Sequence, residues 1–248
     1  MTWRLVGFEY WDAYMNMAID EAVSEAVGQG RSPPTIRFYG WNPSAVSIGC
    51  FQSIHDEVDL EECRRRGIDV VRRRTGGGAV YHDRDGEITY SVISPESMMD
   101  ADINKAYRAI CGWITRALGA LGISATFVPI NDIVVDGKKV SGSAQTRRGG
   151  MFLQHGTLLY GVDPSKMFSI LKVGRTKISD KDIASVEARV TSISRLLSVP
   201  KDRVLNEMIR SFTEDKDCKH GRWTQEELDR ARELASARYA TREWNLRR

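Results

Sequence analysis

The segment RRRTGGGAVYHD, Arg72–Asp83, places three arginines directly before three glycines. Glycine adopts positive φ angles and lets the backbone approach a ligand closely, and successive backbone N–H groups in such a turn form a concave anion site. Side chains alternate between the two faces of a strand, so Arg73 should point away from the face of Arg72 and Arg74. The segment has neither the Gly-Lys-Ser/Thr of a Walker A loop nor the GxGxxG of a dinucleotide turn. It is either an anion-binding loop or an exposed basic turn.

The composition is typical of a soluble globular protein, since 42% of the 248 residues are hydrophobic, 28% are charged and the net charge is +3. This length suits one large domain. Four cysteines without a CxxC pair indicate neither a zinc site nor a disulfide framework, and they favour a reducing compartment. The N-terminal MTWRLVGFEYWD lacks the apolar core of a signal peptide, and no apolar run approaches the roughly 20 residues that span a bilayer. We expect a cytoplasmic protein without a membrane partner.

Arginine clusters at 64–66, 72–74 and 147–148 raise the alternative of a nucleic-acid-binding module. The first cluster fits an exposed helix, EECRRRG, and the other two adjoin the motifs described below. We therefore expect no nucleic-acid partner.

The hydrophobic pattern predicts an α+β fold with a mostly antiparallel sheet flanked by helices. Apolar residues recur at helical spacing over 15–30 and 104–121, and 131–150 contains a hairpin whose turn is Asp136-Gly137. Pro200 suits the first turn of a later helix, and Thr224-x-x-Glu227 is a capping box. The segments TIRFYG, AVSIGCF, DVVRR, EITYSVI and FLQHGTLLYG are rich in strand-forming residues.

The predicted hairpin carries a lysine pair in the sequence DGKKVSGSA. Strand alternation places Lys139 on the face of Ser141 and Ser143, where an ammonium group suits a phosphate or carboxylate. The alternative is that both lysines are solvated beside a turn. Further on, QHGT at 154–157 interrupts an apolar strand, which indicates either a pocket wall or a buried structural histidine.

Taken together, RRRTGGGAVYHD, NDIVV, KVSGSA, QHGTLL and ARVTSI (Ala188–Ile193) resemble, in this order, motifs of the lipoate–protein ligases in the biotin and lipoate ligase superfamily. The resemblance extends from about Trp3 to Asn245. It implies a class II synthetase-like catalytic domain over the whole chain, 1–248. The accessory domain of many relatives is then absent, supplied by a separate small chain, or dispensable.

The resemblance implies an ATP-dependent ligase that makes lipoyl-AMP and transfers the lipoyl group to a lysine of an acceptor. Its cofactors are ATP and Mg²⁺, with lipoate as substrate. The acceptor is a glycine-cleavage H protein, a dehydrogenase acyltransferase subunit or another lipoyl domain.

The same resemblance assigns roles to residues. Lys139 becomes the catalytic electrostatic clamp, Asp132 becomes the Mg²⁺ contact, and His82 and Thr75 line the lipoyl tunnel. The substrate and ATP contacts are Arg73, Thr75, Gly76, Gly77, Gly78, Ala79, Val80, Tyr81, His82, Asn131, Asp132, Ser141, His155, Gly156 and Thr157.

A sister class supplies the main alternative, namely octanoyltransferases that move octanoyl from acyl carrier protein to the same acceptor lysine through a cysteine. GSAQTR and LQHG are similar to that class, whose cysteine lies shortly upstream of the lysine hairpin. Here that region, GISATFVPINDIVV, contains no cysteine. Cys111 is expected in a helix core, which leaves Cys50 as the thiol to test. The missing thiol and Asn131-Asp132 favour the ligase. A biotin ligase is a further alternative.

Overall fold

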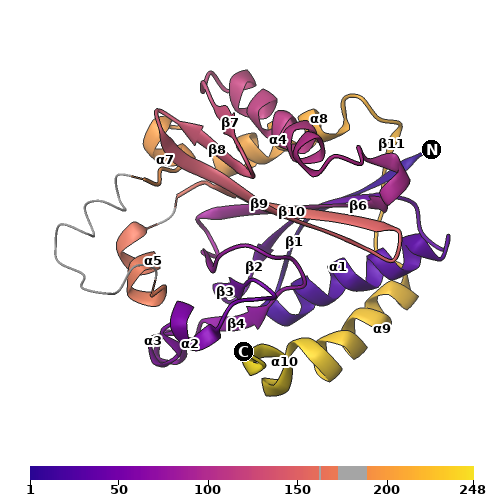
Figure 1. Ribbon diagram of the computed structural model, residues 1–248. Helices are drawn as coiled ribbons and strands as arrows, with labels where there is room; N and C mark the ends of the chain where they lie inside the picture. Colours follow the sequence, from indigo (N-terminus) through magenta and orange to yellow (C-terminus); the bar gives the residue numbers. More distant parts are fainter. Residues whose placement is uncertain (162, 173–188) are drawn as a thin grey trace.

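The computed structural model describes residues 1–161, 163–172 and 189–248. Its main feature is a large sheet in the order β11-β1-β2-β6-β10-β9-β8-β7, next to a small sheet β4-β3-β5 (Figure 1). The strands of the large sheet are β1 (Trp3–Trp11), β2 (Thr35–Trp41), β6 (Glu87–Pro95), β7 (Thr126–Val128), β8 (Asp132–Val135), β9 (Lys138–Arg148), β10 (Met151–Leu159) and β11 (Cys218–His220). The small sheet contains β3 (Ala45–Ile48), β4 (Asp69–Arg72) and β5 (Val80–His82).

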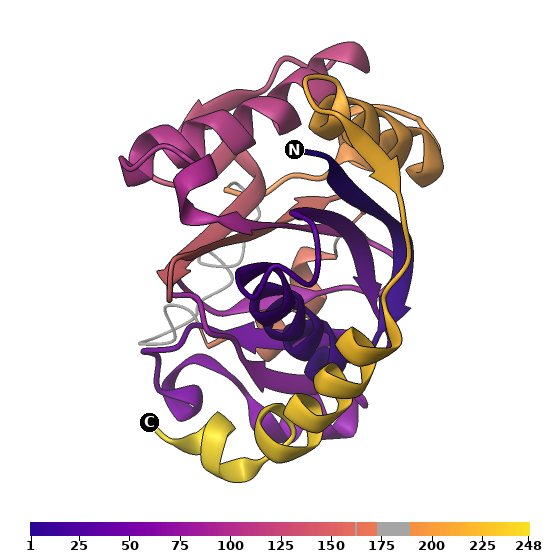
Figure 2. The same ribbon diagram turned by 90° about the vertical axis from the view of Figure 1, so that its right-hand side faces the viewer.

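Helices cover both faces of the large sheet. The α-helices are α1 (Ala13–Gly28), α2 (Ile54–Glu57), α3 (Leu60–Arg65), α4 (Ile103–Ala120), α5 (Pro164–Ile170), α7 (Ile193–Leu196), α8 (Lys201–Thr213), α9 (Gln225–Leu234) and α10 (Arg242–Leu246). Two short helices, η1 (Glu96–Met98) and η2 (Ala235–Tyr239), complete the set in the described residues. Figure 2 shows α4 and α8 on one side of the sheet and α1 and α9 on the other.

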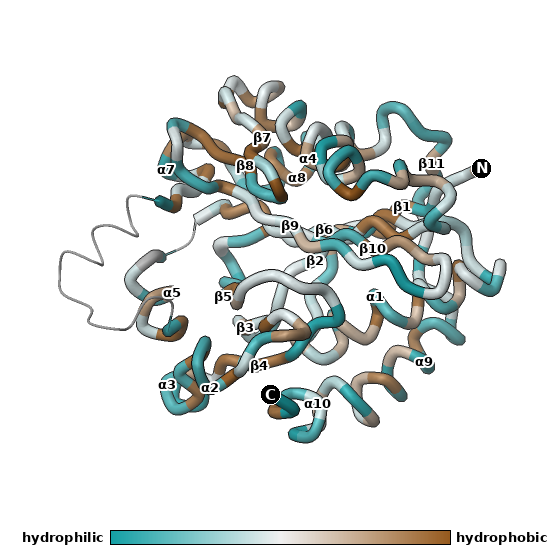
Figure 3. The backbone as a smooth tube through the Cα atoms, in the orientation of Figure 1, coloured by the Kyte–Doolittle hydropathy of each residue, from teal (hydrophilic) through white to brown (hydrophobic). Residues whose placement is uncertain are grey.

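The core is divided in the same way. One buried cluster joins α4 and α8 to one face of the large sheet, through residues such as Ile114, Phe212 and Phe38. A second joins α1 and α9 to the opposite face, through residues such as Ile19 and Trp41. A third lies under the small sheet, α2, α3 and α5. Figure 3 shows hydrophobic stretches in the interior, where the strands of the large sheet overlap, and a hydrophilic α3 at the edge of the molecule.

Much of the predicted organisation is confirmed. The fold is α+β, and the two long helices, the five strand segments, the hairpin and the capping box at Thr224 are all present. Pairing is antiparallel except where β1 joins β11 and β2 and where β3 joins β4. The turn between β8 and β9 contains Asp136 at φ 50° and Gly137 at φ 74°, as Asp-Gly hairpin turns require.

Candidate functional site

A cavity of about 330 Å³ lies where the glycine loop, 75–79, faces β2, β9, β10 and α5. Of the predicted site residues, those that line it are Arg73, Gly77, Gly78, Ala79, Val80, Tyr81, His82, Asn131, Lys139, His155, Gly156 and Thr157. Thr75, Gly76, Asp132 and Ser141 do not line it. The lining residues that sequence reasoning missed are Met17, Tyr39, Trp41, Ser47, Thr89, Gly142, Ser143, Ala144, Leu159, Met167, Phe168, Leu171 and Val190.

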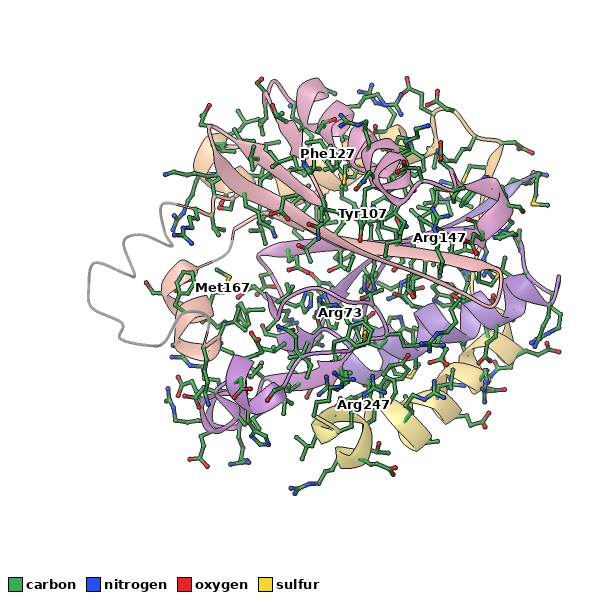
Figure 4. The ribbon with its side chains drawn as sticks, in the orientation of Figure 1. Arg73, Tyr107, Phe127, Arg147, Met167 and Arg247 are labelled. Carbon is green, nitrogen blue, oxygen red and sulfur yellow. The ribbon has the colours of Figure 1, made fainter. Side chains whose placement is uncertain are left out.

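The glycine loop is built around the side chain of Arg73. Its Nη2 donates to the carbonyl oxygens of Gly76 and Gly78 at 2.7 Å each. Its Nη1 donates to the carbonyl and hydroxyl oxygens of Ser47, and its Nε donates to Thr75 Oγ1 at 3.1 Å. These five bonds use all five N–H groups of a guanidinium. Arg73 therefore folds the loop around itself, and burial lowers its pKa to about 10. It lies near the middle of the molecule, with Met167 on α5 to one side (Figure 4).

The prediction that Arg73 points away from its two neighbours is confirmed. Arg72 is fully buried and donates to the carbonyl oxygens of Asn245, Gln52 and Gly49. Arg74 pairs with Glu21 of α1 at 2.5 Å. Neither lines the cavity. The three arginines thus connect the loop to three different parts of the fold.

Glycine is required at one position inside this loop and at one position of the segment that the loop packs against. Gly77 has a φ of 91°, which side-chain-bearing residues rarely adopt. At Gly49, an added Cβ would lie 2.1 Å from the carbonyl oxygen of Gly77. The loop therefore lies directly against the end of β3.

His155 belongs to a buried chain of hydrogen bonds behind the cavity. Its Nε2 lies 2.7 Å from Thr75 Oγ1, and its Nδ1 lies 3.1 Å from Asp20 Oδ2 on α1. Ser91 Oγ donates to the same Asp20 oxygen, and the guanidinium of Arg37 lies 3.5 Å from the other. Burial lowers the pKa of His155, and Asp20 opposes part of that shift. Asp20 was not predicted; it is one of several acidic residues in that helical segment, and nothing in the local sequence distinguishes it.

His82 is held by three contacts. Its Nδ1 lies 2.8 Å from Glu87 Oε1, and its Nε2 lies 2.8 Å from Ser47 Oγ. Its ring stacks on Trp41 with 3.9 Å between centroids and 15° between planes. Both ring nitrogens are therefore already partnered, and the imidazole forms part of a rigid wall.

Lys139 lies at the hairpin end of the cavity, where its Nζ is 2.7 Å from Asp132 Oδ1. The predicted face of Lys139 was wrong, because β8 and β9 shift register between Ile133 and Val134. Val140 is the additional residue of this bulge, and it turns Lys139 onto the face of Gly142. A Cβ on Gly142 would come within 2.7 Å of the lysine ammonium nitrogen. Ser141 faces the other way; its hydroxyl has no hydrogen-bond partner among the described residues.

Asn131 fixes the base of this hairpin. Its Nδ2 donates to the carbonyl oxygen of Ser143 at 2.5 Å, and Ser143 N donates back to the carbonyl oxygen of Asn131 at 3.0 Å. Asn131 and Lys139 both line the cavity.

A magnesium site at Asp132 is not supported. Its carboxylate pairs with Lys139, and no group of three His, Cys, Asp or Glu side chains suited to a metal occurs within the described ranges. A divalent cation in a protein usually takes several oxygen ligands, and one carboxylate occupied by a lysine does not supply them.

All four cysteines lie within the described residues, and none lines the cavity. Cys50 is next to the glycine loop, where its N–H donates to the carbonyl oxygen of Thr75. Cys111 is fully buried, with its Sγ 3.8 Å from Ser143 Oγ, and burial raises its pKa to about 11. Its place in the core is as predicted, and the raised pKa keeps the thiol protonated at neutral pH.

A sequence profile for the lipoyl protein ligase A/B catalytic domain matches residues 12–213. The chain belongs to this family. It is 38% identical to octanoyltransferase LipM of Brevibacillus brevis, over 99% of both chains. It is 34% identical, with a TM-score of 0.88, to a bi-partite lipoate protein ligase of Thermoplasma acidophilum solved in a study with its E2 lipoyl domain; the match covers 99% of this chain and 96% of that one. A lipoate-protein ligase A structure with bound ATP is 32% identical, with a TM-score of 0.86 and 99% coverage of both chains.

These comparisons confirm the family and its fold. They contradict the predicted ATP-dependent ligase, because the curated relative at 38% identity over the full chain is an octanoyltransferase. A second relative at 38% and one of Bacillus subtilis at 34% have the same name. The expectation of acyl-adenylate formation with ATP and Mg²⁺ is therefore not supported, and the sister class is favoured.

Two remaining expectations concern other parts of the chain. The motif ARVTSI begins at Ala188, which lies outside the described residues, whereas Arg189–Ile193 are described and Val190 lines the cavity. Within the described part of the chain, no helix has both the length and the hydropathy of a membrane span.

Proposed function

We propose that this chain is an octanoyltransferase, which moves an octanoyl group from a carrier-protein thioester to a lysine of a lipoyl domain. The observation that carries the proposal is the 38% identity to an octanoyltransferase over 99% of both chains. The acceptor class is supported by the solved relative that was studied with its E2 lipoyl domain. A glycine-cleavage H protein and a dehydrogenase acyltransferase subunit remain the expected acceptors.

The cavity suits a medium-length acyl chain. Aromatic and aliphatic side chains of Tyr39, Trp41, Leu159 and Met167 form much of its wall. Each methylene that leaves water for such a wall contributes about 0.8 kcal/mol. An eight-carbon chain thus gains enough binding free energy to be held without a charged tail contact.

The polar end of the cavity suits the reacting carbonyl. When the acceptor amine attacks the thioester carbon, a C–N bond forms, the C–S bond breaks, and the amine proton leaves with the carrier thiol. Negative charge develops on the carbonyl oxygen during this step. We assign Lys139 to stabilise that charge, with Asp132 orienting the ammonium group at 2.7 Å.

The proposal differs from the sister class in one respect: the acyl group passes directly from carrier to acceptor, without the cysteine intermediate that the sister class uses. None of the four cysteines lines the cavity, and the thiol of Cys111 is protonated and buried. An acyl-enzyme on a cysteine needs a reactive thiolate beside the substrate carbonyl. The lysine amine of the acceptor is then the only nucleophile that the reaction needs.

The test combines the purified chain, octanoyl acyl carrier protein and an unmodified lipoyl domain, without ATP, and follows the acceptor by intact mass spectrometry. An acceptor whose target lysine is replaced by arginine is the control. The expected result is octanoylation of the acceptor by the single chain, with the activity retained in Cys50→Ser and Cys111→Ser. Octanoylation or lipoylation only from the free acid plus ATP would overturn the proposal, and a trapped acyl-thioester on the chain would overturn direct transfer.

A further inference from the structure

The hydrogen bonds behind the cavity have a single consistent direction. Thr75 Oγ1 accepts from Arg73 Nε, so its own proton is available for His155 Nε2 at 2.7 Å. A carboxylate only accepts, so His155 Nδ1 carries the proton and donates to Asp20 Oδ2; Nε2 of the neutral imidazole then accepts from the Thr75 hydroxyl. Thr75 and Asp20 are almost completely buried, at 0% and 2% exposure. If one of these hydrogen-bond partners were removed, a water molecule could take its place only where the substitution itself left a cavity.

The Asp20 end of this series of hydrogen bonds is held by residues of the large sheet. Asp20 also contacts Ser91 of β6 and Arg37 of β2. Arg37 Nη2 donates to Asn16 Oδ1 at 2.6 Å, and the Asn16 amide donates to the carbonyl oxygens of Trp11 and Gly40. This series of hydrogen bonds therefore connects the centre of the large sheet to the guanidinium of Arg73, which shapes the glycine loop.

We propose that Asp20 and His155 are positioning residues, which act through Thr75 to hold Arg73 in the orientation that shapes the acyl cavity. The carboxylate selects the Nδ1–H tautomer of His155, because only a donor can face it. That tautomer keeps Thr75 as a donor to histidine and an acceptor from arginine. With the other tautomer, Nδ1 would face the Asp20 carboxylate without a proton, and the Thr75 hydroxyl proton would lose its acceptor in a buried site.

The inference rests on the proposed function for the identity of the ligand, so its test measures binding rather than transfer. Octanoic acid binding by calorimetry is compared in wild type, Thr75→Val and Thr75→Ser. Valine keeps the volume but removes the hydroxyl, whereas serine keeps both hydrogen bonds. Loss of a buried hydrogen-bond partner should weaken binding about tenfold in Thr75→Val, with recovery in Thr75→Ser. Equal binding by all three proteins would refute the positioning role.

The second measurement begins with the wild-type protein, so its main result does not depend on whether a variant folds. Nitrogen chemical shifts of His155 in the wild-type protein at neutral pH should show a protonated Nδ1 and an unprotonated Nε2. In Asp20→Asn, the amide can donate, and the tautomer should change while the circular dichroism spectrum stays the same. A wild-type His155 with its proton on Nε2, or a charged one, would overturn the inference even if octanoyl transfer were confirmed. Failure of transfer with the expected tautomer would instead count against the proposed function alone.

Discussion

Arg73 and Lys139 are two cations on the wall of one cavity, but they differ in their partners. Every N–H of Arg73 is used, by the glycine loop or by Ser47 of β3, whereas Lys139 pairs with one carboxylate and its side chain is 42% exposed. An ammonium group that is partly open to solvent can turn toward a substrate at little cost. At the scale of single residues, Lys139 is therefore suited to chemistry and Arg73 to architecture.

The catalytic role assigned to Lys139 predicts different effects for the loss of the two hairpin lysines. Lys139→Met should lower the rate of octanoyl transfer by about 10²–10³, the usual effect of losing one oxyanion donor, with an unchanged melting temperature. Lys138→Met is the matched control, because Lys138 is adjacent and exposed and does not line the cavity. If both variants transfer octanoyl at the wild-type rate, Lys139 has no catalytic role.

The buried His155 predicts a dependence of stability on pH. Its folded pKa lies below the usual 6.5. Unfolded chains therefore bind a proton in a pH range where folded chains do not. The free energy of unfolding should be full above about pH 6.5 and should fall as the pH drops toward the lowered pKa. Urea unfolding of wild type and His155→Asn between pH 5 and 7.5, about the range in which free histidine titrates, measures this. If the free energy of unfolding depends on pH in the same way in the two proteins, the prediction is contradicted.

At the scale of elements, the β-bulge in β9 decides which of its residues line the cavity. It places Lys139 over Gly142, and the lysine ammonium is the far end of a flexible chain. The glycine loop differs, because Gly49 meets a backbone carbonyl that cannot move independently. The two glycines therefore tolerate a methyl group very differently.

Alanine at each of these glycines should separate activity from stability. Gly142→Ala should displace Lys139 and reduce transfer with little change in melting temperature. Gly49→Ala should destabilise the fold by about 1–3 kcal/mol, as overpacking does. Thermal melts and transfer rates of both variants test this, and a stable, fully active Gly49→Ala protein would show that the loop can move away.

Sequence alone predicts elements whose signals are local. The Thr224 capping box, the Asp136-Gly137 turn and the long amphipathic helices depend on residues a few positions apart. The bulge at Val140 cannot be predicted in this way, since its cause is the pairing of β9 with β8 and not a glycine or proline. Asp20 was missed for a similar reason, because its partners come from β2, β6 and β10, which only the folded chain brings together.

At the scale of the whole molecule, the C-terminal helices stabilise the glycine loop from outside. Asn245 Oδ1 accepts from Arg72 N at 2.7 Å, and Trp244 Nε1 donates to Arg72 O at 2.8 Å. Arg238 and Tyr239 both bond to Glu21, the partner of Arg74. The family profile ends at residue 213, so these contacts lie beyond its match. Regions far apart in sequence therefore complete one site.

Asn245→Ala tests this long-range support. It leaves the buried N–H of Arg72 without its acceptor, which should cost about 1–3 kcal/mol of unfolding free energy. Glu243→Ala on the same helix is the control, because Glu243 is exposed. Chemical denaturation of both variants gives the comparison. An Asn245→Ala protein as stable as the control would indicate that α10 does not support the loop.

The stack of Trp41 on His82 has a spectroscopic consequence. The indole is buried, lies against an imidazole and borders the cavity, so its fluorescence should respond to what fills that space. An acyl chain that displaces water beside Trp41 should shift its emission to shorter wavelength. The chain has six tryptophans, and Trp41→Phe identifies the contribution of this one. The cavity thus contains its own optical reporter, and ligand binding can be followed in the unlabelled protein.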